Sequence, residues 1–323
     1  MSALLVVRPS SLGDVVHALS IVPDVARARP GMAVDWVCEP AFAELPRLSP
    51  HVRHIIPFAL RRWRHALLAR DTWREAKAFA TAVRETRYDA ILDLQEQVKG
   101  GVVSRIARGV RHGFDRASIR EPIATLFDDV HHRVSRSEHF ATRCRRLAAA
   151  ALGYAVDGPP RWELAPRSDA AVVPGGRYAV VVHATSRDSK LWPEAQWRLL
   201  IEDFARAGIA TILPWGDAGE RERSARLARG IDGASVPGRQ SLGALAKLLA
   251  HADVAVGVDT GLTHLAAALR TPTVALFTQT DPRGAGVSIA GPHALDLGGR
   301  GAIPTIDDVR AALGGLMRDA PRC

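Results

Sequence analysis

The sequence predicts an α/β protein made of two doubly wound, Rossmann-like domains that face a central cleft. Strand and helix patterns alternate along the chain, and 323 residues with 47% hydrophobic content can bury two cores. Periodicity is lost only once, in a Gly- and Pro-rich stretch in the middle. The predicted parts are an N-terminal domain at 1–155, a linker at 156–176, a C-terminal domain at 177–302, and a C-terminal helix and tail at 303–323.

Composition excludes several classes of protein. The cysteines Cys38, Cys144 and Cys323 are odd in number and lack metal-ligand spacing, so we expect neither a disulfide framework nor a zinc site. This use of cysteine fits a protein of a reducing, cytoplasmic compartment. No uninterrupted apolar run approaches the roughly 20 residues of a membrane span. We therefore expect a protein that is soluble or peripheral on a membrane.

The positive charge is concentrated in the first half of the chain. The formal charge is +9, with 24 Lys and Arg against 17 acidic residues in residues 1–160, and 19 against 17 afterwards. Almost all of these basic residues are arginines, whose guanidinium groups suit bidentate contact with phosphate and carboxylate. A nucleic acid, an anionic membrane or an acidic substrate would each fit. Nucleic acid ranks last, because no helix-turn-helix, zinc finger or RNP-like strand is present.

The first predicted strand, at 3–7, is followed by a turn that contains Ser11 and Gly13 and then by a helix. Asp14 falls in the first turn of that helix, at the carboxyl end of the strand. Ligands bind at this edge in open α/β sheets, so Asp14 is a candidate functional carboxylate. The alternative is a carboxylate that only stabilises the start of the helix. The G-x-G-x-x-G fingerprint is absent, which argues against a dinucleotide oxidoreductase.

Strand patterns follow at 33–38, 54–58 and 89–95, and a basic amphipathic segment lies between them at 59–70. On a helix this segment would separate its apolar and basic side chains. It is compatible with a membrane surface, with a site for an acidic ligand, or with an ordinary solvated helix. Its apolar residues are Leu60, Trp63, Leu67 and Leu68, and its basic residues are Arg61, Arg62, Arg64 and His65.

In the second half, strand patterns at 178–184, 209–215 and 252–258 each end in polar residues. The last strand leads through Asp259 and Thr260 to Gly261 and a helix, whose free N–H groups and dipole favour a phosphate. An ordinary helix capped by Thr260 is the alternative. Three such strand ends predict a site for a nucleotide diphosphate. The residues at these ends are Thr185, Ser186 and Lys190; Trp215, Gly216 and Glu220; and Asp259, Thr260, Gly261 and His264.

Seven motifs in order carry a family resemblance: SSLGDVVHAL, LRRWRHA, DLQEQVKG, IREPIATLF, HATSRDSKLWPEAQW, LPWGDAGERER and VDTGLTHLAAAL. Together they resemble the lipopolysaccharide heptosyltransferases of glycosyltransferase family 9. The resemblance implies a GT-B fold with the donor in the C-terminal domain, the acceptor in the N-terminal domain, and a final helix that packs back on the N-terminal domain.

The same resemblance implies the reaction and its setting. It implies inverting, metal-independent transfer of L-glycero-D-manno-heptose from ADP-heptose to the inner Kdo of Kdo2-lipid A. No cofactor is implied, since ADP-heptose is a substrate. We expect a monomer on the inner face of the inner membrane, with no nucleic acid partner.

Residue roles are carried over from the matching motifs. Asp14 matches the catalytic base, and Lys190 would stabilise the departing diphosphate. The residues named above at the three strand ends would bind the donor. Glu96 stands where the family usually has a small residue, so it would either repel an acidic acceptor or pair with an arginine; Thr278 and Gln279 also depart from the family pattern. The acceptor-binding residues would be Ser11, Gly13, Arg61, Arg62, Arg64, Arg120 and His139.

Three other functions remain open from the sequence. One is another family 9 transfer, to a heptose acceptor instead of Kdo. A second is a GT-B nucleotide-sugar epimerase, which needs a donor but no acceptor. The third is a non-catalytic protein that binds anionic lipid or nucleotide, which the presence of both Asp14 and Lys190 disfavours.

Overall fold

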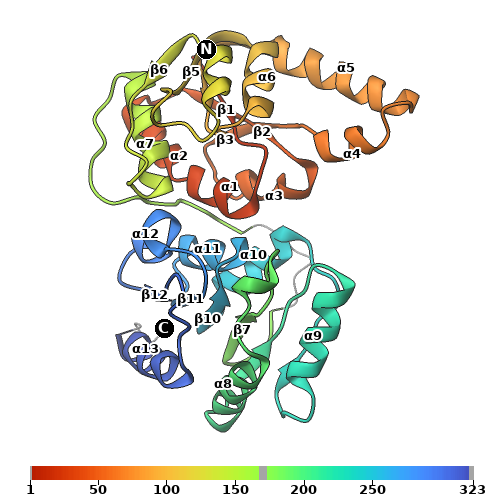
Figure 1. The fold of residues 1–323 in the computed structure, drawn as a ribbon, viewed down its shortest axis with the longest axis vertical. Helices are drawn as coiled ribbons and strands as arrows, with labels where there is room; N and C mark the ends of the chain where they lie inside the picture. Colours follow the sequence, from red (N-terminus) through yellow and green to blue (C-terminus); the bar gives the residue numbers. More distant parts are fainter. Residues whose placement is uncertain (1, 167–172, 320–323) are drawn as a thin grey trace. The chain divides into compact units, whose positions relative to one another are not determined.

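The fold was analysed in a computed structural model, which describes residues 2–166 and 173–319 (Figure 1). The chain divides into two compact units between Glu163 and Leu164. This division lies within the predicted linker at 156–176, whose described residues form no helix or strand. Among the described residues, no helix is long and apolar enough to cross a membrane.

The first unit contains a parallel sheet of six strands, in the order β3-β2-β1-β4-β5-β6, within the described residues. The chain starts in the middle of the sheet, winds outward to β3, and returns to the other side through β4. The switch point lies between β1 and β4, the place where open α/β sheets bind ligands. The strands are β1 Ala3–Val7, β2 Ala33–Cys38, β3 Val52–Pro57, β4 Arg87–Asp93, β5 Arg108–Phe114 and β6 Val130–His132.

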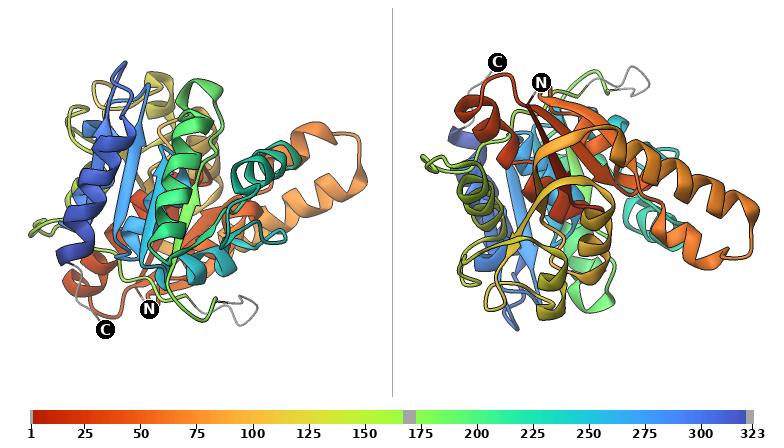
Figure 2. Two further views of the ribbon diagram at one scale, coloured as in Figure 1. Left: turned by 90° about the horizontal axis from the view of Figure 1, so that it is seen from below. Right: turned by 90° about the horizontal axis from the view of Figure 1, so that it is seen from above.

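Helices of the first unit connect these strands, and apolar side chains of β1 and β4 pack with those of α5 and α6 in one core. Two helices, α4 and α5, form a hairpin that projects from the sheet of this unit (Figure 2). The helices are α1 Leu12–Ala18, α2 Ile21–Ala28, η1 Pro40–Phe42, α3 Glu44–Arg47, α4 Leu60–His65, α5 Arg70–Glu85, α6 Val98–Ile106, η2 Pro122–Phe127 and α7 Phe140–Leu152.

The second unit repeats the winding pattern of the first. Its described strands form a six-stranded parallel sheet in the order β12-β11-β10-β7-β8-β9, so its switch point lies between β7 and β10. The central strands β7, β10 and β11 are buried along their whole length, as parallel strands covered on both faces require. The strands are β7 Tyr178–Val182, β8 Ala210–Ile212, β9 Ala234–Ser235, β10 Val254–Val258, β11 Thr273–Phe277 and β12 Ala294–Gly298.

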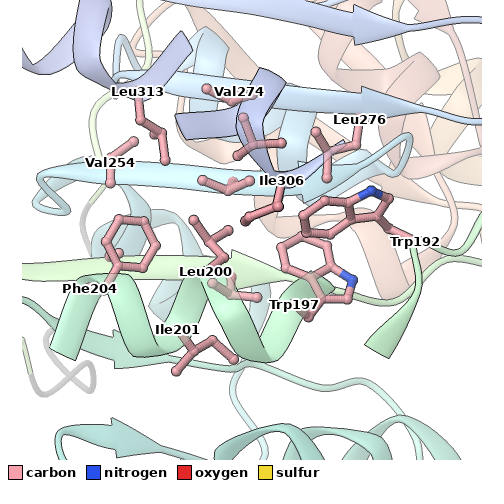
Figure 3. Packing of buried hydrophobic residues seen from close by; sticks show 14 of the residues in the cluster. Trp192, Trp197, Leu200, Ile201, Phe204, Val254, Val274, Leu276, Ile306 and Leu313 are labelled. Carbon is pink, nitrogen blue, oxygen red and sulfur yellow. The ribbon is translucent and has the colours of Figure 1, made fainter. Parts of the chain in front are cut away.

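The last helix, α13, contributes to the core of the second unit. Ile306 and Leu313 of α13 belong to the same buried cluster as Trp197 and Leu200 of α8, and Figure 3 shows Ile306 close to Trp192 and Trp197. The second unit thus buries the apolar face of α13, and the packing of this helix on the N-terminal domain stays a prediction. The helices of this unit are η3 Asp188–Lys190, α8 Glu194–Arg206, α9 Ala218–Ala228, α10 Leu242–Ala250, α11 Gly261–Ala268, α12 Pro282–Ala285, η4 Ser288–Ala290 and α13 Ile306–Asp319.

Candidate active site

Asp14 lies at the switch point of the first unit, where β1 leads into α1. Its Oδ2 atom accepts hydrogen bonds from the backbone N–H of Ser11 (3.0 Å) and from the Ser11 hydroxyl (2.8 Å), and it forms an ion pair with Arg8 (2.5 Å). All contacts that the described residues make to this carboxylate fall on Oδ2. The Asp14 side chain is 39% exposed, so Oδ1 remains accessible to a substrate hydroxyl.

Arg8 fixes both the position and the charge of Asp14. Its guanidinium is buried, donates to the carbonyl of Leu94 at the end of β4, and lies 4.8 Å from the ring centroid of Phe140. Burial acts to raise the pKa of Asp14, but the charge of Arg8 and the hydrogen bonds from Ser11 outweigh it and lower that pKa. Asp14 is therefore ionised at neutral pH, as a general base must be.

Sequence reasoning missed Arg8, although the signal was present. Arg8 follows the first buried strand directly, and a polar residue at a strand end is the same signal that identified Asp14. Asp14 also stabilises the start of α1, which was the alternative role predicted for it. It is the third residue of the helix and accepts a hydrogen bond from the N–H of the N-cap residue. The two roles are compatible in one carboxylate.

Lys99 adds a second cation near this edge. It lies in the first turn of α6 and donates from Nζ to the Ser10 hydroxyl at 3.1 Å. Its pKa is lowered by burial and then by the positive charges of Arg8 and Arg61, while Glu39 and Asp14 act in the opposite direction. Cations therefore accumulate here without full neutralisation, which favours an anionic ligand.

The predicted acceptor-binding residues divide into two groups. Ser11 and Gly13 adjoin Asp14, and His139 packs edge-on against His17 of α1 with ring centroids 5.0 Å apart. Arg61 is near enough to Lys99 to lower its pKa. These residues gather at one edge of the sheet.

Arg120 is placed near the same edge through its neighbour. The N–H of Glu121 donates to the carbonyl of Glu96, in the loop that follows β4. Two residues of the hairpin are directed elsewhere: Arg62 pairs with Glu75 of α5 at 2.6 Å, and Arg64 is exposed on α4. The described contacts do not bring Arg62 and Arg64 to Asp14.

Glu96 pairs with an arginine, which was one of its two predicted alternatives. Its Oε1 lies 2.5 Å from Arg143, both side chains are largely buried, and the Arg143 guanidinium lies over the Phe114 ring at 4.7 Å. Glu96 has φ 59, a left-handed conformation that favours glycine, which agrees with the small residue expected there. The negative charge of the Glu96 carboxylate is thus compensated by the ion pair with Arg143.

Asp259 lies at the switch point of the second unit and holds the predicted donor residues together. Its Oδ2 accepts from Lys190 Nζ and from the Thr280 hydroxyl, both at 2.6 Å, and its Oδ1 accepts from His264 Nε2 at 3.3 Å. The Thr185 hydroxyl donates to the Asp259 carbonyl at 3.1 Å. Thr280 was not predicted, although it is a polar residue in the loop after β11.

Both carboxylate oxygens of Asp259 are thus occupied. Burial acts to raise its pKa, but the hydrogen bonds from His264, Lys190 and Thr280 lower the pKa strongly. Only 13% of the side chain is exposed. We interpret Asp259 as the residue that fixes the Lys190 ammonium, which retains further N–H groups for a ligand.

The start of α11 presents free backbone donors. Thr260 is the N-cap residue, but its side chain makes no capping hydrogen bond, so the capped-helix alternative is not what this segment does. A Cβ at Gly257 would lie 2.1 Å from the Thr263 hydroxyl, which shows how closely α11 approaches β10. The N–H groups at the start of α11 and the helix dipole therefore favour an anion beside Lys190.

The predicted residues after β8 lie one strand further along the same edge. The Trp215 indole N–H donates to the carbonyl of Pro237 at 2.7 Å, and the Arg221 guanidinium lies 5.6 Å from the Trp215 ring centroid. The Glu220 carboxylate accepts from the N–H of Gly216 at 2.6 Å. One Glu220 oxygen is thus used to shape the loop, and the other is available for a sugar hydroxyl. Ser186 is exposed after β7.

Thr278, the residue after β11, contacts the segment that follows β7. Its hydroxyl donates to the carbonyl of Ser189 at 3.1 Å. The loop that departs from the family pattern at Thr278 therefore ties β11 to the segment that carries Lys190. Within the described residues, no group of three His, Cys, Asp or Glu side chains is arranged to hold a metal ion.

Comparison with known proteins identifies the family. The profile of glycosyltransferase family 9 (heptosyltransferase) matches residues 76–290. Lipopolysaccharide heptosyltransferase 1 from Escherichia coli (strain K12) is 42% identical over 282 residues, 86% of this chain and 88% of that protein. The protein of the same name from Pseudomonas aeruginosa is 43% identical over 289 residues, 86% of this chain and 79% of that protein.

Solved structures agree. The E. coli heptosyltransferase WaaC with ADP matches with a TM-score of 0.89 at 37% identity and covers 98% of this chain and 100% of its own. E. coli ADP-heptose lps heptosyltransferase II, at 20% identity and a TM-score of 0.78, shares the fold.

The chain is a glycosyltransferase with the GT-B fold and belongs to glycosyltransferase family 9. Within that family, its likeness at 42% and 43% identity is to lipopolysaccharide heptosyltransferase 1. The resemblance carried by the seven motifs is therefore confirmed.

Proposed function

We propose that this enzyme transfers L-glycero-D-manno-heptose from ADP-heptose to the inner Kdo of Kdo2-lipid A, in lipopolysaccharide inner-core synthesis. The observation that carries the proposal is the likeness, over 98% of the chain, to WaaC solved with ADP and with ADP-2-deoxy-2-fluoro heptose. Transfer inverts the anomeric carbon and requires neither a metal ion nor a cofactor.

The donor diphosphate binds at the switch point of the second unit. Lys190, held by Asp259, neutralises phosphate charge, and the N–H groups at Thr260 and Gly261 bind phosphate oxygens. Thr185, Ser186, His264, Trp215 and Gly216 complete the donor site, and Glu220 accepts from ribose hydroxyls.

Asp14 is the general base in the first unit. A sugar hydroxyl is a weak nucleophile, so it must lose its proton as it attacks. Oδ1 of Asp14 is accessible for that proton, while Arg8 and Ser11 hold Oδ2 in place. Ser11, Gly13, Arg61, Arg120 and His139 position the acceptor beside this carboxylate, with Arg62 and Arg64 further out on α4.

The bond changes balance in one displacement. The acceptor oxygen forms a bond to the anomeric carbon from the face opposite the diphosphate, and the acceptor proton passes to Asp14. The bond between the anomeric carbon and the phosphate oxygen breaks, and ADP departs with the electron pair. Negative charge grows on that diphosphate, and Lys190 with the amides of α11 stabilises it.

We propose that the enzyme acts as a monomer in the cytoplasm, peripherally on the inner face of the inner membrane, without a nucleic acid partner. The acceptor carries Kdo carboxylates and lipid A phosphates. The first half of the chain supports this choice of acceptor, with 24 basic against 17 acidic residues in residues 1–160.

The test is mass spectrometry of Kdo2-lipid A after incubation with the enzyme and ADP-heptose. The expected result is the addition of one heptosyl residue, equal with and without EDTA, in an inverted configuration by NMR. Transfer only to an acceptor that already carries heptose would reassign the enzyme to another family 9 reaction. Conversion of ADP-heptose without acceptor would indicate an epimerase, and no change in any arm would contradict the proposal.

A further inference from the structure

Three large apolar side chains are exposed where α4 leads into α5, two in the connecting turn and one in the first turn of α5. Leu67 is 57% exposed, Leu68 is 100% exposed and Trp73 is 65% exposed. The connection between α4 and α5 is the end of the hairpin that projects from the first unit (Figure 2). Singly exposed apolar residues are common on soluble proteins, but three gathered at one projecting turn mark an interaction surface. We call these three residues the hairpin tip.

The structure divides the apolar residues that the sequence places on one side of this segment, because Leu67 and Leu68 are exposed and two others are not. Leu60 and Trp63 pack inside the unit, where Trp63 lies 5.4 Å from the Phe58 ring centroid and 6.0 Å from that of Phe79. The Trp63 indole also donates to Glu75 at 2.9 Å. Trp63 is therefore buried at the base of the hairpin and is not available to a partner, and Leu60 is partly buried beside it.

The tip itself is held in shape by local hydrogen bonds. The Trp73 indole N–H donates to the carbonyl of Leu67 at 2.8 Å, and the Thr72 hydroxyl donates to the carbonyl of Ala66 at 2.8 Å. The polar atom of Trp73 is thus satisfied within the turn. The ring and the two leucines remain exposed without needing a hydrogen-bond partner, as entry into an apolar phase requires.

Charge favours an anionic partner. Residues 60–77 contain six Lys or Arg against two acidic residues. Arg62, Arg64, Arg70, Arg74 and Lys77 are all exposed. An apolar tip surrounded by basic side chains matches the interface of a bilayer, where apolar residues enter below the headgroups and cations meet lipid phosphates.

A second exposed apolar pair in the same unit lacks this charge pattern. Ile123 is 62% exposed and Leu126 is 72% exposed on η2, but residues 118–131 contain one arginine against three acidic residues.

We propose that the hairpin tip inserts into the interface of an anionic membrane and thereby anchors the first unit at the surface that holds its acceptor. This inference rests on the proposed function only for the choice of membrane-bound acceptor. A protein partner for the tip is the competing occupant, and the experiment below distinguishes the two.

The full-length enzyme is mixed with vesicles of phosphatidylethanolamine and phosphatidylglycerol that contain no lipid A. Binding is measured by flotation, with phosphatidylcholine vesicles in parallel. Wild type is expected to bind the anionic vesicles, and the double variant Leu67→Gln/Leu68→Gln to bind at least about tenfold more weakly. Ile123→Gln is the matched control and should bind as wild type does. High salt should weaken binding of wild type.

Tryptophan fluorescence gives a second measurement on the folded enzyme. Anionic vesicles should shift emission to shorter wavelength in wild type, and Trp73→Phe should remove most of that shift. Circular dichroism checks that each variant is folded. Absence of wild-type binding to anionic vesicles, or equal loss in Ile123→Gln and the double variant, overturns the proposal.

Transfer to a water-soluble acceptor without acyl chains separates this inference from the proposed function. The double variant should keep wild-type turnover on that acceptor, because the tip contacts only lipid. If wild type binds vesicles through the tip but transfers no heptose, the proposed function fails and the membrane contact stands. If transfer occurs but vesicle binding does not, the tip proposal fails and the function stands.

Discussion

The two switch points each carry an aspartate at the start of a helix, yet the two carboxylates are used differently. Asp14 is held on one oxygen by Arg8 and Ser11 and keeps 39% of its side chain exposed. Asp259 is held on both oxygens by Lys190, Thr280 and His264 and is 13% exposed. The pKa is lowered at both residues.

The difference shows that an ionised carboxylate at a switch point is not by itself a general base. A base needs an oxygen that the protein leaves accessible, and only Asp14 has one. Both oxygens of the Asp259 carboxylate accept hydrogen bonds from neighbouring side chains. We therefore interpret Asp259 as the residue that positions the Lys190 ammonium. The predictions below test this division between chemistry in the first unit and donor binding in the second.

Asp14→Asn should have the largest effect on turnover. The amide preserves the shape of the side chain but cannot accept a proton, so kcat should fall by about 10²–10⁴-fold. Affinity for ADP, measured by calorimetry, should stay close to that of wild type because the proposed donor site lies in the second unit. Loss of ADP binding with turnover retained would refute the assignment.

Lys190→Ala should affect both binding and rate. It removes a cation that meets the diphosphate before and during departure, so kcat should fall by about 10²-fold and ADP affinity should also weaken. Steady-state kinetics and calorimetry measure the two effects separately. Lys247→Ala, on α10 of the same unit, is the control for general loss of positive charge. Kinetics of Lys190→Ala that match wild type would exclude this role.

Arg8→Gln should change the pH dependence of the rate. Without the arginine charge, burial raises the pKa of Asp14, and a smaller fraction of the carboxylate is ionised at mildly acidic pH. The acidic limb of the kcat profile should move up by roughly 1–3 pH units. Arg8→Lys keeps the charge and should leave the limb near that of wild type. A limb that does not move in Arg8→Gln would mean that Arg8 is only structural.

Thr280→Val should have the smallest effect. It removes one hydrogen bond to the Asp259 carboxylate while keeping the size of the side chain, so donor affinity should fall by about tenfold or less. Thr278→Val is the matched control, since that hydroxyl donates to the Ser189 carbonyl and not to Asp259. An equal loss in both variants would indicate a loop effect and not a role for the carboxylate network.

The central strands were predictable because their sequences are almost wholly apolar. Residues 3–7, 33–38 and 254–258 are nearly continuous runs of buried residues, and each forms the predicted strand. β5 and β6 were not predicted. β5 at Arg108–Phe114 carries two arginines, a histidine and two glycines among seven residues, and β6 at Val130–His132 has only three residues, two of them histidines. Neither segment has the apolar run or the strict alternation on which strand prediction depends.

The site was predictable as a set of strand ends but not as a network. Asp14, Lys190 and Asp259 were found because polar residues that follow buried parallel strands meet at one edge of a sheet. The ion pair of Arg8 with Asp14 and the hydrogen bond from Thr280 to Asp259 join residues far apart in sequence or across a loop. Spacing along one chain contains no information on such pairs, so they required the three-dimensional structure.

The burial of α13 in the second core has a consequence for the order in which the enzyme is made. Synthesis proceeds from the N-terminus, and the first unit has all of its strands once the residues before Glu163 have left the ribosome. The second unit leaves Trp197 and Leu200 partly uncovered until α13 has been translated. Chains that end at Thr305 should therefore expose apolar surface of the second unit that chains carrying α13 bury, and binding of a hydrophobic dye would measure the difference.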